Sequence, residues 1–443
     1  MERQQVKKLY EKIKNRITPL VANGFLWIFG GNFAAQFFGF VSSVVVIRNL
    51  SKAEYGVYVD ANNIYSYMAI FIGMGMISAI LQFCSENVSN QRKTAIYQFA
   101  FSTGSVFNLA LLVVIYAVGC FYKPDGAGYY LRLMCAYPIV IYTNNYMQMA
   151  LRVKRKNREF GLVYMVYAVT ICAGNIVFTF LWGVKGLVIS SYFTQVIAAS
   201  TAFAFLKRDG FFTEVTAPVE KLDRAGRREV SSYCLLCIAT NFVTTALVLL
   251  DITCLNLVLG DSQVLADYKV ASAIPSAMMF VPTSLVTYFY PLMVEAYSTD
   301  PDSFGAKLVD YGKVFLAVAL LLSVIMLAFA PIIIYIVYGE KYMSGVPVFR
   351  ILCVNFFVNA GIRTILTNSL YVIKKVNINL VLATLAGVLN VVLDLWLIGK
   401  MGSTGAAVAT VVVTLFISLL ELAYVMFHLR RGRAAKNAPD STD

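Results

Sequence analysis

The residues most able to do chemistry in this sequence are ionisable side chains that interrupt long apolar runs. Arg363 and Lys269 are cations in such runs, and Asp251 and Asp394 are acids. An arginine fork suits the oxygens of a phosphate or pyrophosphate. Acids held in apolar surroundings often exchange protons or cations. We therefore interpret the two cations as candidate ligands of an anionic substrate and the two acids as candidate ion-coupling residues.

Each of these residues also has a purely structural interpretation. Arg363 could form a buried pair with an acid such as Glu421, and Asp251 or Asp394 could pair with Lys269 or another base. A buried charge needs such a partner because its desolvation is costly. Both interpretations stay open from the sequence.

Further polar residues share helix faces in the same kind of run. At about 100° per residue, Asn32 and Gln36 lie on one face, and Asn241 belongs to a polar face of a later run. Asn355 and Asn359 are four residues apart and lead on to the arginine. We predict that these amides contact the substrate. For the polar residues on any single helix face, the alternative to substrate contact is hydrogen bonding between packed helices.

Composition places these runs in a membrane. Of the 443 residues, 59% are hydrophobic and 14% are charged, whereas soluble domains have about 25% charged residues. Runs of about 20 apolar residues, enough to cross a bilayer, recur along the chain. We predict an all-α polytopic membrane protein with twelve spans. Their approximate bounds are 22–47, 57–83, 95–121, 129–150, 160–183, 186–206, 230–259, 266–291, 312–338, 346–371, 376–398 and 404–428.

The basic residues predict the orientation. With alternating loops, 27 lysines and arginines fall on the side of the N-terminus, nine fall on the other side, and Arg363 lies inside a span. Basic loops stay in the cytoplasm, so both termini are predicted to be cytoplasmic. The net charge of +13 is thus mainly a topology signal, and we expect no nucleic acid as a partner.

The sequence lacks the residue patterns of metal sites, redox cysteine motifs and ATP-binding loops. The only histidine is His428, and the pair Cys234 and Cys237 lies in an apolar run without a second pair. We interpret these cysteines as core residues and expect neither a metal site nor a cofactor. The sequence has no phosphate-binding loop of the GxxxxGK[ST] type. We therefore expect a protein that is not itself an ATPase or another enzyme.

The second half of the chain repeats the first. Asn32 and Phe33 correspond to Asn241 and Phe242, and the block that starts at Asn175 corresponds to the block that starts at Asn390. Six spans are an even number, so both copies enter the membrane in the same direction. We predict six-helix bundles over 1–206 and 230–443, joined by a cytoplasmic linker over 207–229.

The stretch between the first two predicted spans, Arg48–Tyr58 (RNLSKAEYGVY), predicts a capped helix start. Ser51 and Glu54 have the spacing of a capping box. The whole stretch resembles the hallmark of the polysaccharide-type branch of the multidrug/oligosaccharidyl-lipid/polysaccharide (MOP) exporter superfamily, although Ser51 stands where that family often has glycine. The resemblance continues at Asp251, Gly260–Val270, Tyr290 with Pro291, and Tyr338–Tyr342.

This resemblance implies a function. It implies two bundles around a central cavity, and a flippase that moves an undecaprenyl-pyrophosphate glycan across the bacterial inner membrane by alternating access. Implied partners are the lipid-linked oligosaccharide and membrane lipids, with a glycan polymerase and chain-length proteins as further candidates. A multidrug/cation antiporter of the same fold is the alternative. A membrane-embedded glycan polymerase or ligase fits less well, because the predicted external loops are short.

Overall fold

The chain is mainly α-helical in the residues that the computed structural model describes, which are 25–85, 89–299, 301–373 and 375–436. These residues form two compact units. The first comprises the described residues up to Leu50 and those from Ile64 to Phe242, and the second comprises Ser51–Asn63 and the described residues from Val243 onward. Two helices contribute to both units, α3 (Lys52–Ala69) and α10 (Arg224–Leu259).

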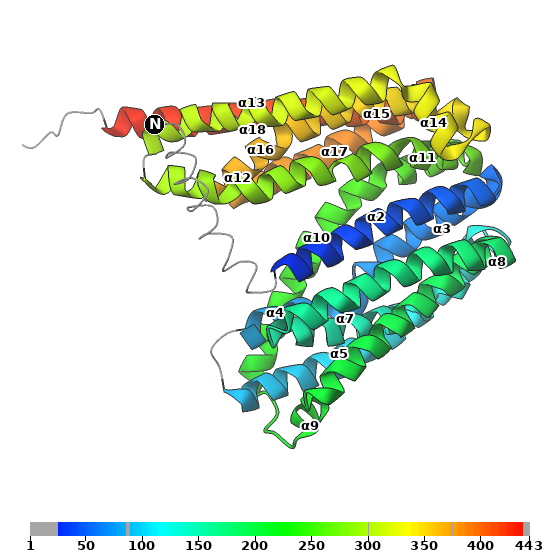
Figure 1. Cartoon of the computed structure of the whole chain (residues 1–443), viewed down its shortest axis with the longest axis vertical. Coiled ribbons are helices and arrows are strands. Elements are labelled where there is room, and N and C mark those ends of the chain that lie inside the picture. The colour runs from blue at the N-terminus through cyan, green and yellow to red at the C-terminus, as the bar shows by residue number, and fades with distance from the viewer. Residues whose placement is uncertain (1–24, 86–88, 300, 374, 437–443) are drawn as a thin grey trace, which may run out of the picture. The chain divides into compact units, whose positions relative to one another are not determined.

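The first unit is built around long antiparallel helices (Figure 1). Besides parts of α3 and α10, its elements are α2 (Phe25–Asn49), the 3-10 turn η1 (Ile72–Gly75), α4 (Met76–Ser85), α5 (Asn90–Phe121), α6 (Ala127–Met134), α7 (Tyr137–Val153), α8 (Asn157–Arg208) and α9 (Phe211–Thr216). In it, α2 packs along α8, and α7 packs on α8 as well.

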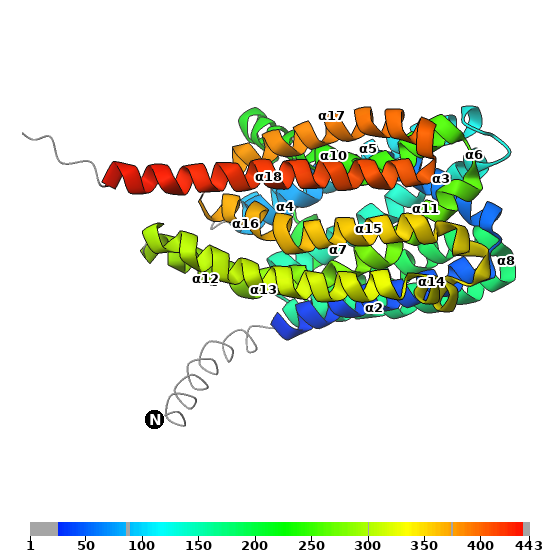
Figure 2. The same ribbon diagram turned by 90° about the horizontal axis from the view of Figure 1, so that it is seen from above.

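In the second unit, α13, α15, α17 and α18 run alongside one another (Figure 2). Besides the first part of α3 and the second part of α10, its elements are α11 (Ser262–Met278), α12 (Phe280–Thr299), α13 (Pro301–Ala328), α14 (Ala330–Tyr338), the 3-10 helix η2 (Glu340–Gly345), α15 (Val346–Val358), the π-helix η3 (Asn359–Arg363), α16 (Thr364–Val372), α17 (Val376–Met401) and α18 (Ser403–Lys436).

The helices have the length and composition of membrane spans. In the described part of the chain, eight helices are long and apolar enough to cross a bilayer. A bent pair within α10, Arg224–Val243 and Thr245–Leu259, would make nine. Large apolar side chains such as Phe180, Val388 and Val392 are exposed on them, as lipid-facing residues are. The polytopic all-α prediction is confirmed, and the number twelve stays a prediction.

Glycines allow neighbouring spans to turn back tightly. Gly183 has a positive φ of 59° and divides α8 into two arms. The arms lie against each other, since a Cβ on Gly174 would come within 2.7 Å of Ser190 Oγ, sixteen residues later. Gly402, with a φ of 62°, makes the equivalent turn between α17 and α18. Two predicted spans, 160–183 and 186–206, therefore meet at Gly183 inside one helical element.

The predicted capping box is present at the start of α3. The Glu54 amide donates to Ser51 Oγ at 3.2 Å, and the Ser51 amide donates to Glu54 Oε2 at 3.0 Å. Two amides at the helix start are thereby satisfied. The stretch that carries the family resemblance is thus a structural device that begins this helix.

Candidate functional site

The two predicted ion-coupling acids lie together inside the second unit, and we call Asp251 and Asp394 the acid pair. Asp251 accepts hydrogen bonds from the hydroxyl of Thr410, at 2.9 Å, and from that of Tyr268. Asp394 is fully buried and lies against Asp251, but its carboxyl oxygens have no hydrogen bond in the described structure. Two carboxylates in contact away from water need a proton or a cation between them.

Four helices hold the acid pair. Asp251 comes from α10, Tyr268 from α11, Asp394 from α17 and Thr410 from α18. Asn390, one turn before Asp394, also lies against Asp251. The acids do not pair with Lys269 in the described structure, so that structural interpretation was wrong for this base. A carboxylate, an amide and hydroxyl oxygens are the ligands that a small hard cation accepts.

The repeat places a neutral counterpart of this cluster in the first unit. Counting on from the matched asparagines, Ser42 corresponds to Asp251, Asn175 to Asn390, and Thr179 to Asp394. Asn175 Nδ2 donates to Ser42 Oγ at 2.8 Å, so the same two positions meet in both units. Ser42 and Thr179 are buried. The fold therefore builds the same junction twice and gives carboxylates to only one copy.

Asn355 and Asn359, the two amides of the predicted span 346–371, line a small cavity within the second unit. Asn355 and Asn359 face Ser272 and Ser276 of α11 across a space of about 80 Å³. The Asn355 side-chain oxygen is buried and has no hydrogen bond in the described residues. A polar cavity of this size has room for water. These four polar side chains, which come from α11, α15 and η3, are thus brought together.

Arg363 leaves that stripe and turns to α18. Its Nε lies 3.8 Å from Glu421 Oε1, and Thr367 Oγ1 lies 3.1 Å from both oxygens of the same carboxylate. Glu421 is fully buried, whereas the Arg363 side chain keeps 26% of its exposure. The π-helix η3 explains the departure, because its wider turn breaks the α-helical register after Asn359. The structural alternative, a buried pair with Glu421, is present.

Of the two predicted cations, Lys269 is the one that has no acid partner among the described residues. It lies in the candidate span Ser262–Val286, and its side chain is exposed. A charged side chain within a span is costly unless it serves a pathway or a ligand. Lys269 therefore has the properties expected of an anion-binding residue, and its role stays a prediction.

The remaining predicted site residues, Asn32, Gln36 and Asn241, belong to the first unit. Gln36 on α2 and Asn241 on α10 are exposed. Asn32 belongs to α2, but its side chain lies outside the described structure. Their predicted role as substrate contacts stays untested.

Sequence reasoning missed an ion pair at the start of α3. Lys52 Nζ lies 2.7 Å from Asp267 Oδ2 of α11, and Ser344 Oγ donates to the same oxygen at 2.9 Å. Asp60 and Asn63, farther along α3, are buried, and Asn256 donates to Asp60 at 2.8 Å. Pairs of this kind depend on which helices meet, which a stripe on one helix does not reveal.

Metal-ligating clusters are not found in the described residues. No group of three or more histidine, cysteine, aspartate or glutamate side chains could hold an ion there. All eight cysteines are free, and Cys234 is buried with its Sγ 3.7 Å from Met76 Sδ.

Known proteins resemble this chain in sequence and in fold. A family profile described as polysaccharide biosynthesis protein matches residues 21–297. A membrane protein of Methanocaldococcus jannaschii, described as uncharacterized, is 22% identical over 413 residues, which are 88% of this chain and 80% of that protein.

Two solved structures share the architecture. An inward-facing multidrug resistance MATE family transporter of the MOP superfamily superposes with a TM-score of 0.73 at 14% identity, covering 90% of this chain and 95% of that one. The lipid II flippase MurJ, in an inward closed conformation, gives 0.71 at 16% identity, with coverages of 89% and 86%. At these identities the likeness is one of fold.

Proposed function

We propose a substrate and a direction of transport from one premise: this chain belongs to the polysaccharide biosynthesis protein family and is a membrane transporter or flippase of the MOP superfamily. Its proposed substrate is a lipid-linked oligosaccharide of the undecaprenyl-pyrophosphate type. The protein moves it from the cytoplasmic to the outer leaflet of the bacterial inner membrane. Both termini are cytoplasmic in this proposal, and a glycan polymerase and chain-length proteins act on the product.

The proposal depends mainly on the position of Lys269. It is an exposed cation within a membrane-length helix, and the described residues offer it no acid. A pyrophosphate head group supplies the missing negative charge. The amides of Asn355 and Asn359, beside Ser272 and Ser276, supply hydrogen-bonding groups of the kind that a glycan needs.

The acid pair supports ion coupling of this movement. Two buried carboxylates in contact favour the bound state of a proton or a cation, and they repel each other when it leaves. Because Asp251 and Asp394 come from α10 and α17, that change acts on the packing of two helices. We propose that the occupancy of this pair biases the second unit between conformations.

The test is transbilayer movement in proteoliposomes. The purified protein is reconstituted with a short undecaprenyl-pyrophosphate glycan, and its exposure to an added glycosidase is followed over time. Lys269→Ala is expected to slow flipping at least tenfold, and Lys269→Arg should retain most of it. Lys400→Ala is the matched control, since Lys400 is an exposed lysine that lies over Trp396 at the end of α17. Flipping by the Lys269→Ala protein at the wild-type rate would refute the role of this lysine.

The alternative proposal is a multidrug/cation antiporter, which the MATE-like fold and the acid pair favour. An antiporter exports soluble cationic drugs, whereas a flippase exposes a lipid-borne glycan. Drug efflux by the same vesicles without any glycan movement would favour the antiporter and overturn the flippase proposal.

A further inference from the structure

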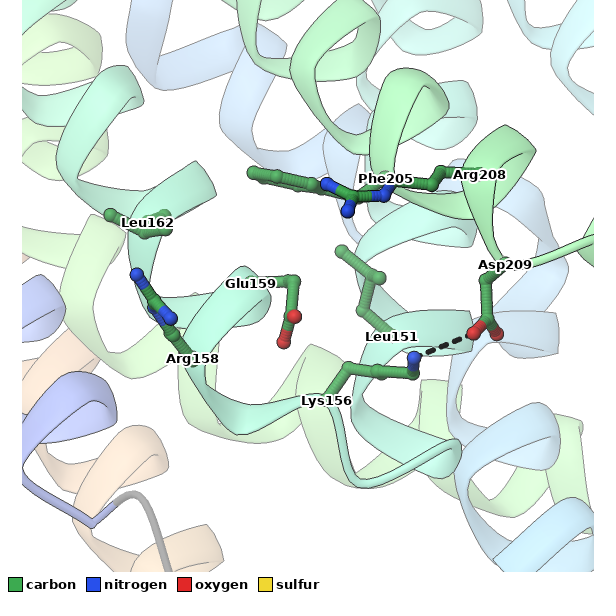
Figure 3. Close-up of a pocket in the computed structure, with 8 residues that line it drawn as sticks. All are labelled: Leu151, Lys156, Arg158, Glu159, Leu162, Phe205, Arg208 and Asp209. Carbon is green, nitrogen blue, oxygen red and sulfur yellow. Dashed lines mark ion pairs between the residues drawn. The ribbon is translucent and has the colours of Figure 1, made fainter.

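Another cavity, lined by charged residues, lies in the first unit, apart from every residue used above. It has a volume of about 460 Å³, and we call it the basic pocket (Figure 3). Its lining comes from the end of α7, the start of α8 and the end of α8. The residues are Leu151, Lys156, Arg158, Glu159, Leu162, Phe205, Arg208 and Asp209. Its volume is in the range of about 300–1,000 Å³ that ligand sites occupy.

A tight turn shapes one side of the basic pocket. Arg155 adopts a positive φ of 57° between α7 and α8. The Arg155 amide donates to the Arg152 carbonyl at 3.0 Å, and the Lys156 amide donates to the Leu151 carbonyl at 2.9 Å. This geometry ends α7 and starts α8 within a few residues. It places the Lys156 and Arg158 side chains at the same rim.

Ion pairs fix this turn to the far end of α8. The Asp209 carboxylate forms ion pairs with Lys156 Nζ, at 2.6 Å, and with Lys154 Nζ, at 3.0 Å. Lys154 Nζ also lies 2.7 Å from Glu214 Oε2. The two lysines lower the pKa of the Asp209 carboxyl. The rim is thus held by contacts that do not require a ligand, so the pocket is preorganised for binding.

The charges of the lining favour an anion. Its three bases outnumber its two acids, which leaves one positive charge. Arg208 is exposed and has no ion pair within the described residues. Figure 3 shows Arg158, Lys156 and Arg208 on three sides of the space with Glu159 between them. A ligand with one negative charge and a hydrogen-bond donor matches this arrangement, since the donor would meet the Glu159 carboxylate.

We propose that the basic pocket binds the head group of an anionic phospholipid with a hydroxylated head, such as phosphatidylglycerol. The guanidinium group of Arg208 holds the phosphodiester, and Glu159 accepts a hydrogen bond from the head-group hydroxyl. Leu162 and Phe205 line the pocket with apolar surface for the start of an acyl chain. Basic pockets between spans on the cytoplasmic side bind the head groups of anionic lipids. The distribution of lysine and arginine over the loops predicts that the basic pocket faces the cytoplasm.

Native mass spectrometry of the full-length protein provides the test. Detergent micelles receive phosphatidylglycerol, phosphatidylethanolamine or phosphatidylcholine in separate titrations, and inorganic phosphate is added alone in a fourth. The expected result is one retained phosphatidylglycerol that binds at least tenfold more tightly than the other two lipids. Arg208→Ala should weaken its binding at least tenfold, and Arg208→Lys should weaken it less.

Lys207→Ala is the matched control, since Lys207 is the exposed neighbour of Arg208 outside the pocket lining. Glu159→Gln tests selectivity and should reduce the preference for phosphatidylglycerol over phosphatidylcholine. Equal binding of all three lipids, or equal losses in Lys207→Ala and Arg208→Ala, would overturn the proposal. Displacement of the lipid by millimolar inorganic phosphate would assign the pocket to a soluble anion instead.

Discussion

Replacement of Arg363 by alanine separates the two interpretations of this arginine. In the wild-type protein its guanidinium lies 3.8 Å from the carboxylate of Glu421, which is fully buried. The substitution leaves that carboxylate with the hydroxyl of Thr367 as its neighbour, at 3.1 Å from each oxygen. One hydroxyl cannot neutralise a charge that has been removed from water.

The expected loss of stability follows from this geometry. At 3.8 Å and an effective dielectric constant of about 20, two unit charges attract by about 4 kcal/mol. Removing one partner of a buried pair typically costs about 3–5 kcal/mol. We expect Arg363→Ala to lower the free energy of unfolding by about 3 kcal/mol. Glu421→Gln should cost about 1 kcal/mol, because Arg363 retains some contact with solvent.

The assay combines stability and flipping for four proteins: the wild type, both single variants and Arg363→Gln with Glu421→Gln. Unfolding is followed in nanodiscs, and flipping in proteoliposomes. If the arginine only neutralises Glu421, the double variant should recover both stability and flipping. If it also binds the pyrophosphate, the double variant recovers stability but not flipping, and Glu421→Gln keeps flipping. An Arg363→Ala protein with wild-type stability would refute the energetic reasoning, and full flipping would remove the substrate role.

Three further predictions follow from described contacts. Gly186→Ala should lower the free energy of unfolding by about 3 kcal/mol, because its Cβ would lie 1.8 Å from the carbonyl oxygen of Phe178. Gly399→Ala, with no atom within 4 Å of its Cβ, should be neutral in the same measurement. The lowered pKa of Asp209 means that its pair with Lys156 stabilises the protein above about pH 4 and ceases to do so as the pH falls further. The difference in unfolding free energy between wild type and Asp209→Asn, at most about 1 kcal/mol at pH 7, should therefore shrink as the pH falls below about 4 and disappear once the pH is below the lowered pKa of Asp209. Asparagine at both positions of the acid pair should leave flipping insensitive to ionophores that dissipate proton and sodium gradients. Wild-type flipping that already ignores those gradients would contradict coupling.

The sequence predicted the features that depend on neighbours along the chain. Apolar runs of about 20 residues predicted a polytopic helical membrane protein, and the spacing of Ser51 and Glu54 predicted the capping box. It also named Glu421 as a partner of Arg363, because acids inside spans are few. These signals are local, or they follow from the high cost of a buried charge.

Features that depend on tertiary packing were not predictable in this way. The contact of Tyr268 with Asp251 requires that α10 and α11 meet at one level, and nothing along either helix indicates that level. The π-helix at the end of the amide stripe has no sequence signal here, and it redirects Arg363. The start of α3 packs in the second unit although it precedes most of the first unit in the chain.

The two copies of the repeat differ in how much electrical work they can do. Where the second unit has Asp251 and Asp394, the first has the hydroxyls of Ser42 and Thr179, which carry no charge across the membrane. Each elementary charge that moves through 100 mV supplies about 2.3 kcal/mol, which corresponds to a concentration ratio of about 50. With a single coupled site, one such charge per cycle contributes a ratio of about 50 at 100 mV to the excess of cargo in the outer leaflet. Such a transporter suits a lipid-linked glycan that is consumed on arrival, and would serve poorly for a compound that must be expelled against a steep gradient.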